Sequence, residues 1–193
     1  MLAFAMAYLL HNEIYELGLK SFGSGVLISD TARIYHPHLV SIGDKVRIDD
    51  FVVLSGKVTI GKFVHISMNS ALLASDQEII LEDFSGISPG CSLFTSFDDY
   101  SGGSMTNPTV PNEFRHVLFG SIVLKRHVIV GAHSVIGPGV IIGEGAAVGA
   151  LSLVNSSVPA WTINGGVPSK FLKNRKKDLL NYESKLENWS FES

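Results

Sequence analysis

The chain has 193 residues, of which 46% are apolar and 17% charged, and its formal net charge is −3. This length is enough for one sizeable domain with its own core. The small negative charge gives no electrostatic basis for nucleic-acid binding, so no nucleic-acid partner is expected. The single cysteine, Cys91, excludes an intramolecular disulfide framework and a cysteine-based zinc site.

Residues 1–22 are predicted to form a helical N-terminal segment. An apolar run extends from Met1 to Leu10, with no Lys or Arg ahead of it and no clear cleavage pattern after it, which argues against a signal peptide. The run is also too short to cross a bilayer. We therefore expect a packing helix and a cytoplasmic protein without membrane insertion.

Residues 23–160 repeat with a period of six. An aliphatic residue fills every sixth position, glycine often follows it, and the fifth position is often small or branched. A period of six fits neither an α-helix nor an amphipathic strand. It fits a parallel β-helix whose coils have three short faces, with aliphatic residues stacked inside and glycines relieving the bends. The inward positions are predicted to be Ile42, Ile48, Leu54, Ile60, Ile66 and Leu72, then Leu81, Ile87 and Leu93, then Leu124, Val130, Ile136, Ile142, Val148 and Val154.

Two interruptions divide the repeat. The spacing between Leu72 and Leu81 carries three surplus residues, which predicts a bulge. Residues 97–121 show no sixfold pattern and form a predicted excursion loop, which we expect to be functional because it is long and rich in large apolar groups. Residues 161–193 leave the repeat as a C-terminal tail, with a charged helix predicted from Lys177 to Glu192.

The repeat, the excursion loop and the tail "NGGVPSKFLKNR" (Asn164–Arg175) together resemble the hexapeptide-repeat acyltransferases. The likeness covers roughly Val26 to Asn174. It implies an all-β fold, a left-handed parallel β-helix, and the left hand is taken from the family rather than from the spacing. It also implies a homotrimer in which acetyl-CoA lies in the groove between two prisms and the acceptor lies under the long loop.

The resemblance also implies residues for the acyl donor. In the family the tail closes the CoA groove, and backbone groups of the late coils hold the pantetheine arm. Small side chains there let a ligand approach the backbone, and basic side chains pair with phosphates. The alternative for the basic residues is a solvated helix start. The implied cofactor-binding residues are Gly131, Ala132, Gly149, Ala150, Lys170, Lys173 and Arg175.

Two catalytic candidates follow from the need for a general base. Galactoside and maltose acetyltransferases carry a catalytic His in a stretch that matches "ISPGCSLFTSFDDYSGG" here, and Asp98 occupies its place. A carboxylate suits an amine acceptor better than a hydroxyl, and Asp99 could orient the same group. The second candidate is His65, which we expect at a corner of the prism, with Asn69 nearby as a substrate contact.

Further substrate contacts are predicted in the excursion loop. Phe97 and Tyr100 could stack on the base or sugar, or could only pack the loop onto a neighbouring prism. His116 ends the loop, and His127 is expected at the surface. No two His residues show metal-ligand spacing with a carboxylate, so no metal is expected.

The loop motifs "SFDDYSG" and "SMTNPTVP" narrow the resemblance to acyltransferases of bacterial surface-polysaccharide pathways. Among these it is most similar to the dTDP-4-amino-4,6-dideoxyglucose (viosamine) N-acetyltransferases. The implied function is acetyl-CoA-dependent N-acetylation of a nucleotide-linked amino sugar. One alternative is O-acetylation of a lipopolysaccharide or capsule sugar. Another is a non-catalytic β-helix scaffold, which the long loop and the "GGVPSK" tail disfavour.

Overall fold

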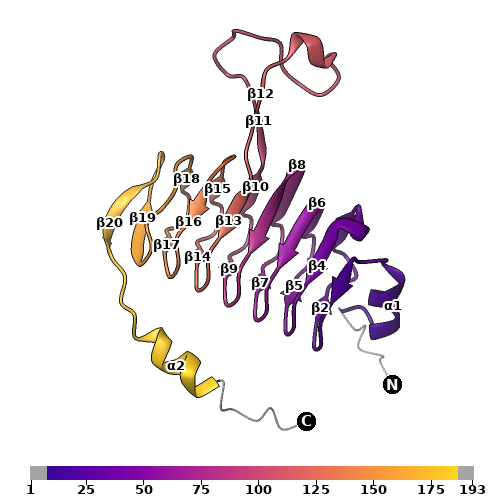
Figure 1. Ribbon diagram of the computed structural model, residues 1–193, viewed down its shortest axis with the longest axis vertical. Helices are drawn as coiled ribbons and strands as arrows, with labels where there is room; N and C mark the ends of the chain where they lie inside the picture. Colours follow the sequence, from indigo (N-terminus) through magenta and orange to yellow (C-terminus); the bar gives the residue numbers. More distant parts are fainter. Residues whose placement is uncertain (1–7, 187–193) are drawn as a thin grey trace.

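The computed structural model describes residues 8–186. Within that range the chain winds into a left-handed parallel β-solenoid of about seven turns. Figure 1 shows the turns stacked side by side, with one hairpin projecting from an edge of the column. The fold predicted from the sixfold repeat is confirmed.

One face of the column is an eight-stranded sheet that is parallel up to its last strand. Each strand is short because a corner follows every few residues. In spatial order the strands are β2 (Leu27–Ile28), β5 (Arg47–Ile48), β7 (His65–Ile66), β9 (Gly86–Ile87), β14 (Ile129–Val130), β17 (Ala147–Val148), β19 (Thr162–Gly165) and β20 (Lys170–Asn174).

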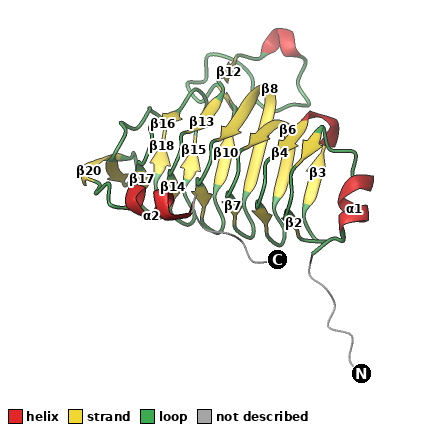
Figure 2. Cartoon of the chain, turned by 60° about the horizontal axis from the view of Figure 1, so that its bottom comes forward, coloured by secondary structure: helices red, strands yellow, loops and turns green. Residues whose placement is uncertain are grey.

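The other two faces form a ten-stranded sheet, because two long strands, β6 and β8, run through the corner between them. Figure 2 shows these long strands in the middle of the column. The strands are β1 (Ser21–Phe22), β3 (Arg33–Tyr35), β4 (Val40–Ile42), β6 (Val53–Ile60), β8 (Ala71–Leu81), β10 (Ser92–Phe94), β13 (Ile122–Leu124), β15 (Val135–Ile136), β16 (Ile141–Ile142) and β18 (Leu153–Val154).

The core is the stack of inward aliphatic residues along the axis. Leu54 pairs in register with Leu72, Leu72 with Leu93, and Leu93 with Ile136. All four are fully buried. Each fully buried aliphatic side chain contributes about 1.5–3 kcal/mol, and because every coil supplies both sides of a contact, stability comes from stacking neighbours.

The glycines that follow the aliphatic residues have a different role from the one predicted. Left-handed backbone is found three residues after the aliphatic position, at non-glycine residues such as Phe63 (φ 56°) and Phe84 (φ 59°). A Cβ on Gly43 would lie 2.7 Å from the carbonyl carbon of Gly61, and one on Gly131 would lie 2.4 Å from the amide nitrogen of Ala150. These glycines therefore permit close approach of successive coils.

The repeat is interrupted at two places. The pairing of β6 with β8 shifts register between Ser55 and Lys57, which absorbs the surplus residues after Leu72. The excursion begins as an antiparallel hairpin stem of β11 (Ser96–Asp98) and β12 (Val117–Phe119), with a 3-10 turn at Asn112–Phe114.

The chain ends differ from the predicted boundaries. The N-terminal helix α1 covers only His11–Glu16, because Gly18 takes a left-handed φ of 70° and β1 already belongs to the first coil; residues 1–7 lie outside the described range. At the other end, β19 continues the solenoid and β20 folds back on it antiparallel. Helix α2 spans Leu179–Leu186, and residues 187–192 of the predicted helix lie outside the described range. Within residues 8–186, no helix is long and apolar enough to span a membrane.

Candidate active site

A row of outward positions crosses the eight-stranded sheet near one corner, and we call it the central row: Asp49, Ser67, Ser88, Gly131 and Gly149. Amide-to-carbonyl hydrogen bonds between coils hold it in register, from Ser67 to Ile87, from Ser88 to Val130 and from Gly131 to Val148. Adjacent members are therefore about 4.8 Å apart. The first three positions carry polar side chains, and the last two are bare.

His65 lies beside the polar half of the central row. It points outward from β7, so the prediction that it occupies a corner was wrong; the corner residue of that coil is Asn69, with φ 59°. The His65 Nε2 atom lies 2.8 Å from Asp49 Oδ2 and 3.5 Å from Ser67 Oγ. The imidazole is about half exposed, so it remains open to a ligand.

Asp49 is buried beneath His65 and is held from several sides. Arg47 Nε donates to Asp49 Oδ1 at 2.6 Å, and the Tyr8 hydroxyl donates to the same oxygen at 3.2 Å. Burial acts to raise the pKa of the Asp49 carboxyl, but the hydrogen bonds from His65 and Arg47 outweigh it, and the pKa is lowered from its usual value. Asp49 is therefore an ionised anchor for the imidazole.

Two glycines of the eight-stranded sheet are not required by its packing. A Cβ on Gly149 would make only ordinary contacts of 3.6 Å or more, and one on Gly86 would meet nothing within 4 Å. Neither has a left-handed φ. Gly131, in contrast, has no room for a Cβ. Bare backbone at Gly149, with Ala150 beside it, leaves the surface there open to a ligand.

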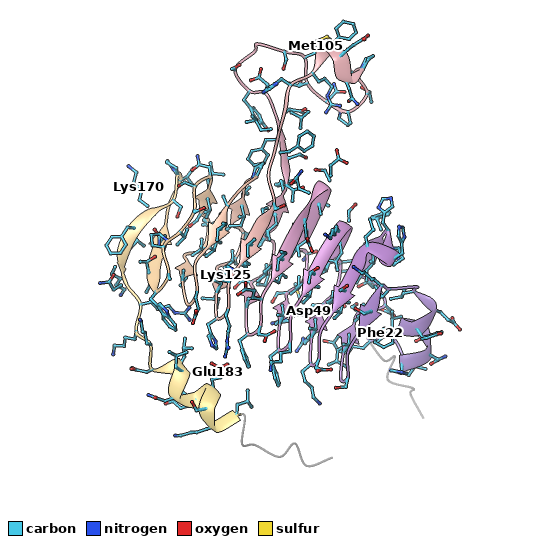
Figure 3. All side chains as sticks on the ribbon, in the orientation of Figure 1. Phe22, Asp49, Met105, Lys125, Lys170 and Glu183 are labelled. Carbon is cyan, nitrogen blue, oxygen red and sulfur yellow. The ribbon has the colours of Figure 1, made fainter. Side chains whose placement is uncertain are left out.

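The basic residues of the tail lie in two different environments. Lys170 and Lys173 are exposed on β20 at the end of the sheet, and Figure 3 shows Lys170 at that edge of the column. Arg175 is turned inward instead. Its Nη1 donates to the carbonyls of His127, Gly145 and Ala146 at 2.9, 3.1 and 3.2 Å. That nitrogen is thus committed to fixing the tail against the solenoid.

Asp98 is held at the end of the hairpin stem, where the loop begins. Arg115 Nη2 pairs with Asp98 Oδ1 at 3.3 Å, and the amide of Asn107 donates to Asp98 Oδ2 at 3.2 Å. Arg115 also donates from Nη1 to Asn112 Oδ1, and its side chain is only 13% exposed. The guanidinium group therefore connects the hairpin stem, the 3-10 turn and the Asp98 carboxylate.

The other predicted loop residues are spread along the hairpin. The carboxylate of Asp99 accepts hydrogen bonds from the Ser101 amide and the Ser104 hydroxyl, and the bonds from Ser101 lower its pKa. The Phe97 and Tyr100 rings contact edge to face at 6.5 Å, and Tyr100 is 90% exposed. The His116 side chain lies on the exposed part of the loop.

The hairpin and the central row lie on different sides of one chain. The hairpin leaves through the corner between the two faces of the ten-stranded sheet, whereas the central row lies on the eight-stranded sheet. Figure 3 accordingly places Met105, at the hairpin tip, far from Asp49. Within a single chain, Asp98 and the central row therefore do not form one site.

Sequence reasoning missed three residues of this arrangement. Ser88 could have been found by extending the sixfold register one position beyond the aliphatic Ile87. Asp49 could have been found in the same way, because it directly follows Ile48. The contact of Arg115 with Asp98 depends on the hairpin register, for which the loop sequence carries no periodic signal. Among the described residues, no group of three His, Cys, Asp or Glu side chains is arranged to hold a metal ion.

Comparison with known proteins identifies the family. Over 182 residues the chain is 41% identical to dTDP-4-amino-4,6-dideoxy-D-glucose acyltransferase of Escherichia coli, covering 93% of this chain and 94% of that protein. The chain belongs to this family of acyltransferases. No family model matches the sequence.

Solved structures agree with this assignment. The N-acyltransferase AntD of Bacillus cereus, in complex with dTDP and 3-hydroxybutyryl-CoA, is 44% identical with a TM-score of 0.93, covering 94% of this chain and 97% of that one. A second AntD structure, with dTDP-4-amino-4,6-dideoxyglucose and coenzyme A, is 43% identical with a TM-score of 0.93, covering 94% and 98%. The family's acyltransferase activity confirms the prediction of an enzyme and removes the scaffold alternative.

A more distant structure shares the fold. A hexapeptide-repeat acetyltransferase of Vibrio cholerae O1 biovar eltor, complexed with acetyl coenzyme A, is 22% identical with a TM-score of 0.63, covering 88% of this chain and 80% of that one. Its likeness supports the left-handed β-helix.

Proposed function

We propose that the protein transfers an acyl group, acetyl as the simplest case, from a CoA thioester to the 4-amino group of a dTDP-linked 4-amino-4,6-dideoxy sugar. The observation that carries the proposal is 41–44% identity, over more than nine-tenths of the chain, to acyltransferases named for this sugar or solved with it and coenzyme A. Asp98, in the place where sugar O-acetyltransferases carry a His, supports an amine acceptor.

The reaction forms one C–N bond and breaks one C–S bond. The neutral 4-amino nitrogen attacks the thioester carbonyl, the proton released from nitrogen passes to Asp98 or His65, and the CoA thiolate leaves and is reprotonated. Asp98 is the better supported base, because it stands where related sugar acetyltransferases carry their catalytic His and because an aspartate was the position varied in solved AntD structures. Much of the rate enhancement would come from holding the amine and thioester in line.

Ser88 joins the proposed site on independent grounds. Solved AntD structures include variants at one aspartate and at one serine that are ten residues apart in that chain. Ser88 and Asp98 have the same separation here, in a chain aligned over nearly its whole length. The Ser88 hydroxyl would donate to the developing oxyanion, because the amides of Gly131 and Gly149 already donate to Val148 and Asn164.

The donor would lie along the bare half of the central row. Gly149, Ala132 and Ala150 would face the pantetheine arm, and Lys170 and Lys173 would meet the phosphates. Coil packing already accounts for glycine at position 131, and Arg175 Nη1 is already bonded to solenoid carbonyls. These two residues are therefore the least supported of the predicted CoA contacts. Asn69, Phe97, Asp99, Tyr100 and His116 remain predicted contacts of the nucleotide sugar.

The enzyme is proposed to act as a homotrimer. Since the hairpin projects away from the eight-stranded sheet of its own chain, the Asp98 of one subunit would meet the central row of the next. Exposed apolar residues on the hairpin stem, Leu118 (54%) and Phe119 (51%), are suited to such a contact. The likeness of the loop motifs to acyltransferases of bacterial surface-polysaccharide pathways supports a proposed role in the cytoplasmic synthesis of such a polysaccharide.

A substrate comparison tests the proposal. Purified protein is incubated with acetyl-CoA and either dTDP-4-amino-4,6-dideoxyglucose or the matching dTDP-6-deoxyglucose, and free thiol is followed. We expect turnover only with the amino sugar. Turnover of the hydroxyl sugar alone would instead support O-acetylation, and turnover of neither would reject the assignment of the acceptor.

A further inference from the structure

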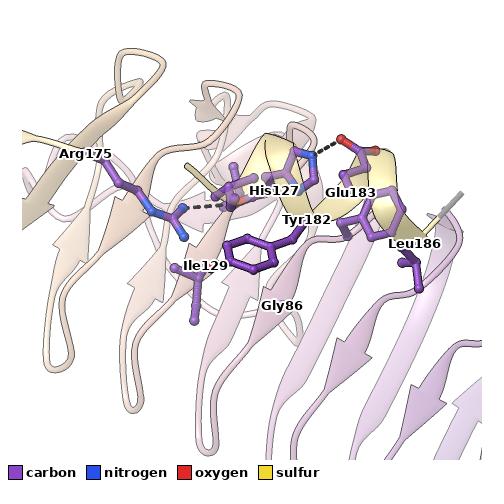
Figure 4. A pocket seen from close by; sticks show the side chains of 10 residues that line it. Gly86, His127, Ile129, Arg175, Tyr182, Glu183 and Leu186 are labelled. Carbon is purple, nitrogen blue, oxygen red and sulfur yellow. Dashed lines mark hydrogen bonds and ion pairs between the residues drawn. The ribbon is translucent and has the colours of Figure 1, made fainter. Parts of the chain in front are cut away.

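A cavity of about 460 Å³ lies between helix α2 and the eight-stranded sheet. Figure 4 shows the helix passing over the sheet, with side chains from both converging on the space between them. The floor is formed by Gly86, Ile129 and Val128, and the roof by Leu179, Tyr182 and Leu186. The lining is mainly apolar. Of the residues predicted to contact the substrate or the CoA phosphates, Arg175 alone lines this cavity.

The cavity is open because of Gly86. This residue follows Arg47 and His65 in a second outward row of the sheet, and Ile129 comes after it. A Cβ on Gly86 would meet nothing within 4 Å, so neither packing nor backbone conformation requires glycine there. The missing side chain leaves a notch in the sheet surface between His65 and Ile129.

The roof of the cavity is anchored by charged contacts. His127, which was predicted at the surface, is buried at a corner of the solenoid, and its Nε2 lies 2.9 Å from Glu183 Oε2. Arg126 pairs with the same carboxylate. Arg175, at the start of the connection to α2, is bonded to three solenoid carbonyls. These contacts keep an eight-residue helix over an apolar floor instead of releasing it to solvent.

The cavity begins one outward strand position away from the proposed reaction centre. Gly86 and Ser88 flank the inward residue Ile87, so both face outward from the same strand, roughly 7 Å apart. A thioester carbonyl bound at Ser88 would therefore have the mouth of the cavity two residues away along the strand. Of the groups attached to that carbonyl, the acyl chain is the one without polar atoms to satisfy.

We propose that the cavity under α2 binds the acyl chain of the donor, and that the enzyme prefers aliphatic acyl groups of about four to six carbons over acetyl. The inference rests on the proposed function for the position of the thioester, and it adds the class of acyl group and the residues that select it. Gly86 and Leu179 are then specificity-determining residues.

Binding in the absence of the acceptor sugar tests the cavity separately from the reaction. Affinities for CoA, acetyl-CoA, butyryl-CoA and hexanoyl-CoA are measured by isothermal titration calorimetry on the full chain. Each buried methylene should tighten binding about fourfold, so we expect butyryl-CoA, which has two more methylenes, to bind about fifteenfold more tightly than acetyl-CoA. Equal affinities across the series would overturn the proposal.

Variants then locate the effect. Gly86→Leu should fill the notch and lower the butyryl-to-acetyl ratio of kcat/KM, and of affinity, at least tenfold. Leu179→Ala should enlarge the cavity and raise the hexanoyl-to-butyryl ratio. Asn181→Ala is the matched control, because Asn181 lies on the same helix, is exposed and does not line the cavity. Its ratios should equal those of the native protein.

The outcomes separate the two proposals. If the native protein binds longer acyl-CoAs more tightly and Gly86→Leu removes that preference, the cavity is the acyl site even when no transfer to the amino sugar is seen. If transfer to the amino sugar occurs but Gly86→Leu and Leu179→Ala leave both ratios unchanged in folded protein, the acyl site is elsewhere and the proposed function stands.

Discussion

The solenoid and the hairpin that projects from it are held by different forces. In the solenoid, buried residues such as Leu54 and Leu93 lie in register with equivalents in the coils on either side. In the hairpin, apolar side chains such as Leu118 and Phe119 are about half exposed, and the order comes from a few polar contacts around Arg115. The first region is held by apolar packing, whereas the second leaves apolar side chains exposed in the single chain.

Because of this difference, we expect the solenoid to determine the stability of the protein and the hairpin to determine its activity. Fixed, repeated packing gives the central row its spacing, and the hairpin carries the carboxylate that we propose as the base. Substitutions in the solenoid should therefore be seen first in unfolding, and substitutions in the hairpin first in turnover. The following tests run from the largest expected effect to the smallest.

Replacing the hairpin carboxylate should have the largest effect. Asp98→Asn keeps the shape of the side chain but removes the base, so we expect kcat for the amino sugar to fall by about 10²–10⁴. Steady-state kinetics measure the loss, and thermal unfolding should shift little. Glu113→Gln, on the exposed 3-10 turn, is the control and should retain activity. A fall of less than threefold in Asp98→Asn would exclude this residue as the base.

A cavity in the solenoid should act on stability instead. Leu93 is fully buried between Leu72 and Ile136, so Leu93→Ala should lower the free energy of unfolding by about 2–5 kcal/mol. Leu118→Ala removes the same atoms from a hairpin side chain that is half exposed in the single chain, so at dilutions that separate the subunits it should change this free energy by about 0.5 kcal/mol or less. Denaturant titration measures both, and similar losses would mean that the hairpin is packed as firmly as the column.

Arg115 should influence turnover through Asp98. Arg115→Ala removes the ion pair that orients the carboxylate, so we expect about a tenfold lower kcat with a smaller change in KM and an altered pH profile of kcat/KM. Arg115→Lys should restore part of the activity. Asn112→Ala breaks only the other contact of the guanidinium group and should cost less; an equal loss would point to general disorder of the loop.

The smallest effect is expected from the anchor beneath His65. Because the pKa of Asp49 is lowered in the folded protein, its ionised form stabilises the fold above the unfolded value near 3.8, and this contribution disappears as the pH falls through the folded pKa. Asp49→Asn should therefore lower Tm at pH 7, and the difference in Tm should shrink as the pH falls below 3.8. A Tm difference that is independent of pH would show that charge is not involved.

Much of the solenoid could be predicted because its packing is periodic. Positions Ile42 to Leu72 were assigned inward from spacing alone, and the surplus after Leu72 marked a real bulge. The sequence did not show which position of each hexapeptide forms the corner. The left-handed backbone there is adopted by residues such as Phe63 and Phe84, which ordinarily disfavour it. That is why His65 was expected at a corner and is found on a strand. The contacts of Arg115 and Glu183 join segments far apart in sequence and have no period to reveal them.

The left-handed corners have a further consequence for how the molecule comes apart. Within residues 8–186, eleven non-glycine residues have positive φ, and each such residue is disfavoured by about 1–2 kcal/mol in isolation. Inside the column a ring at one corner rests on the next, as the Phe84 ring does between Phe63 and His127. The outermost turns have a neighbour on one side only, so unwinding should begin there. Strand β20 folds back antiparallel on β19 and covers the last turn, so it should slow the unwinding of that end.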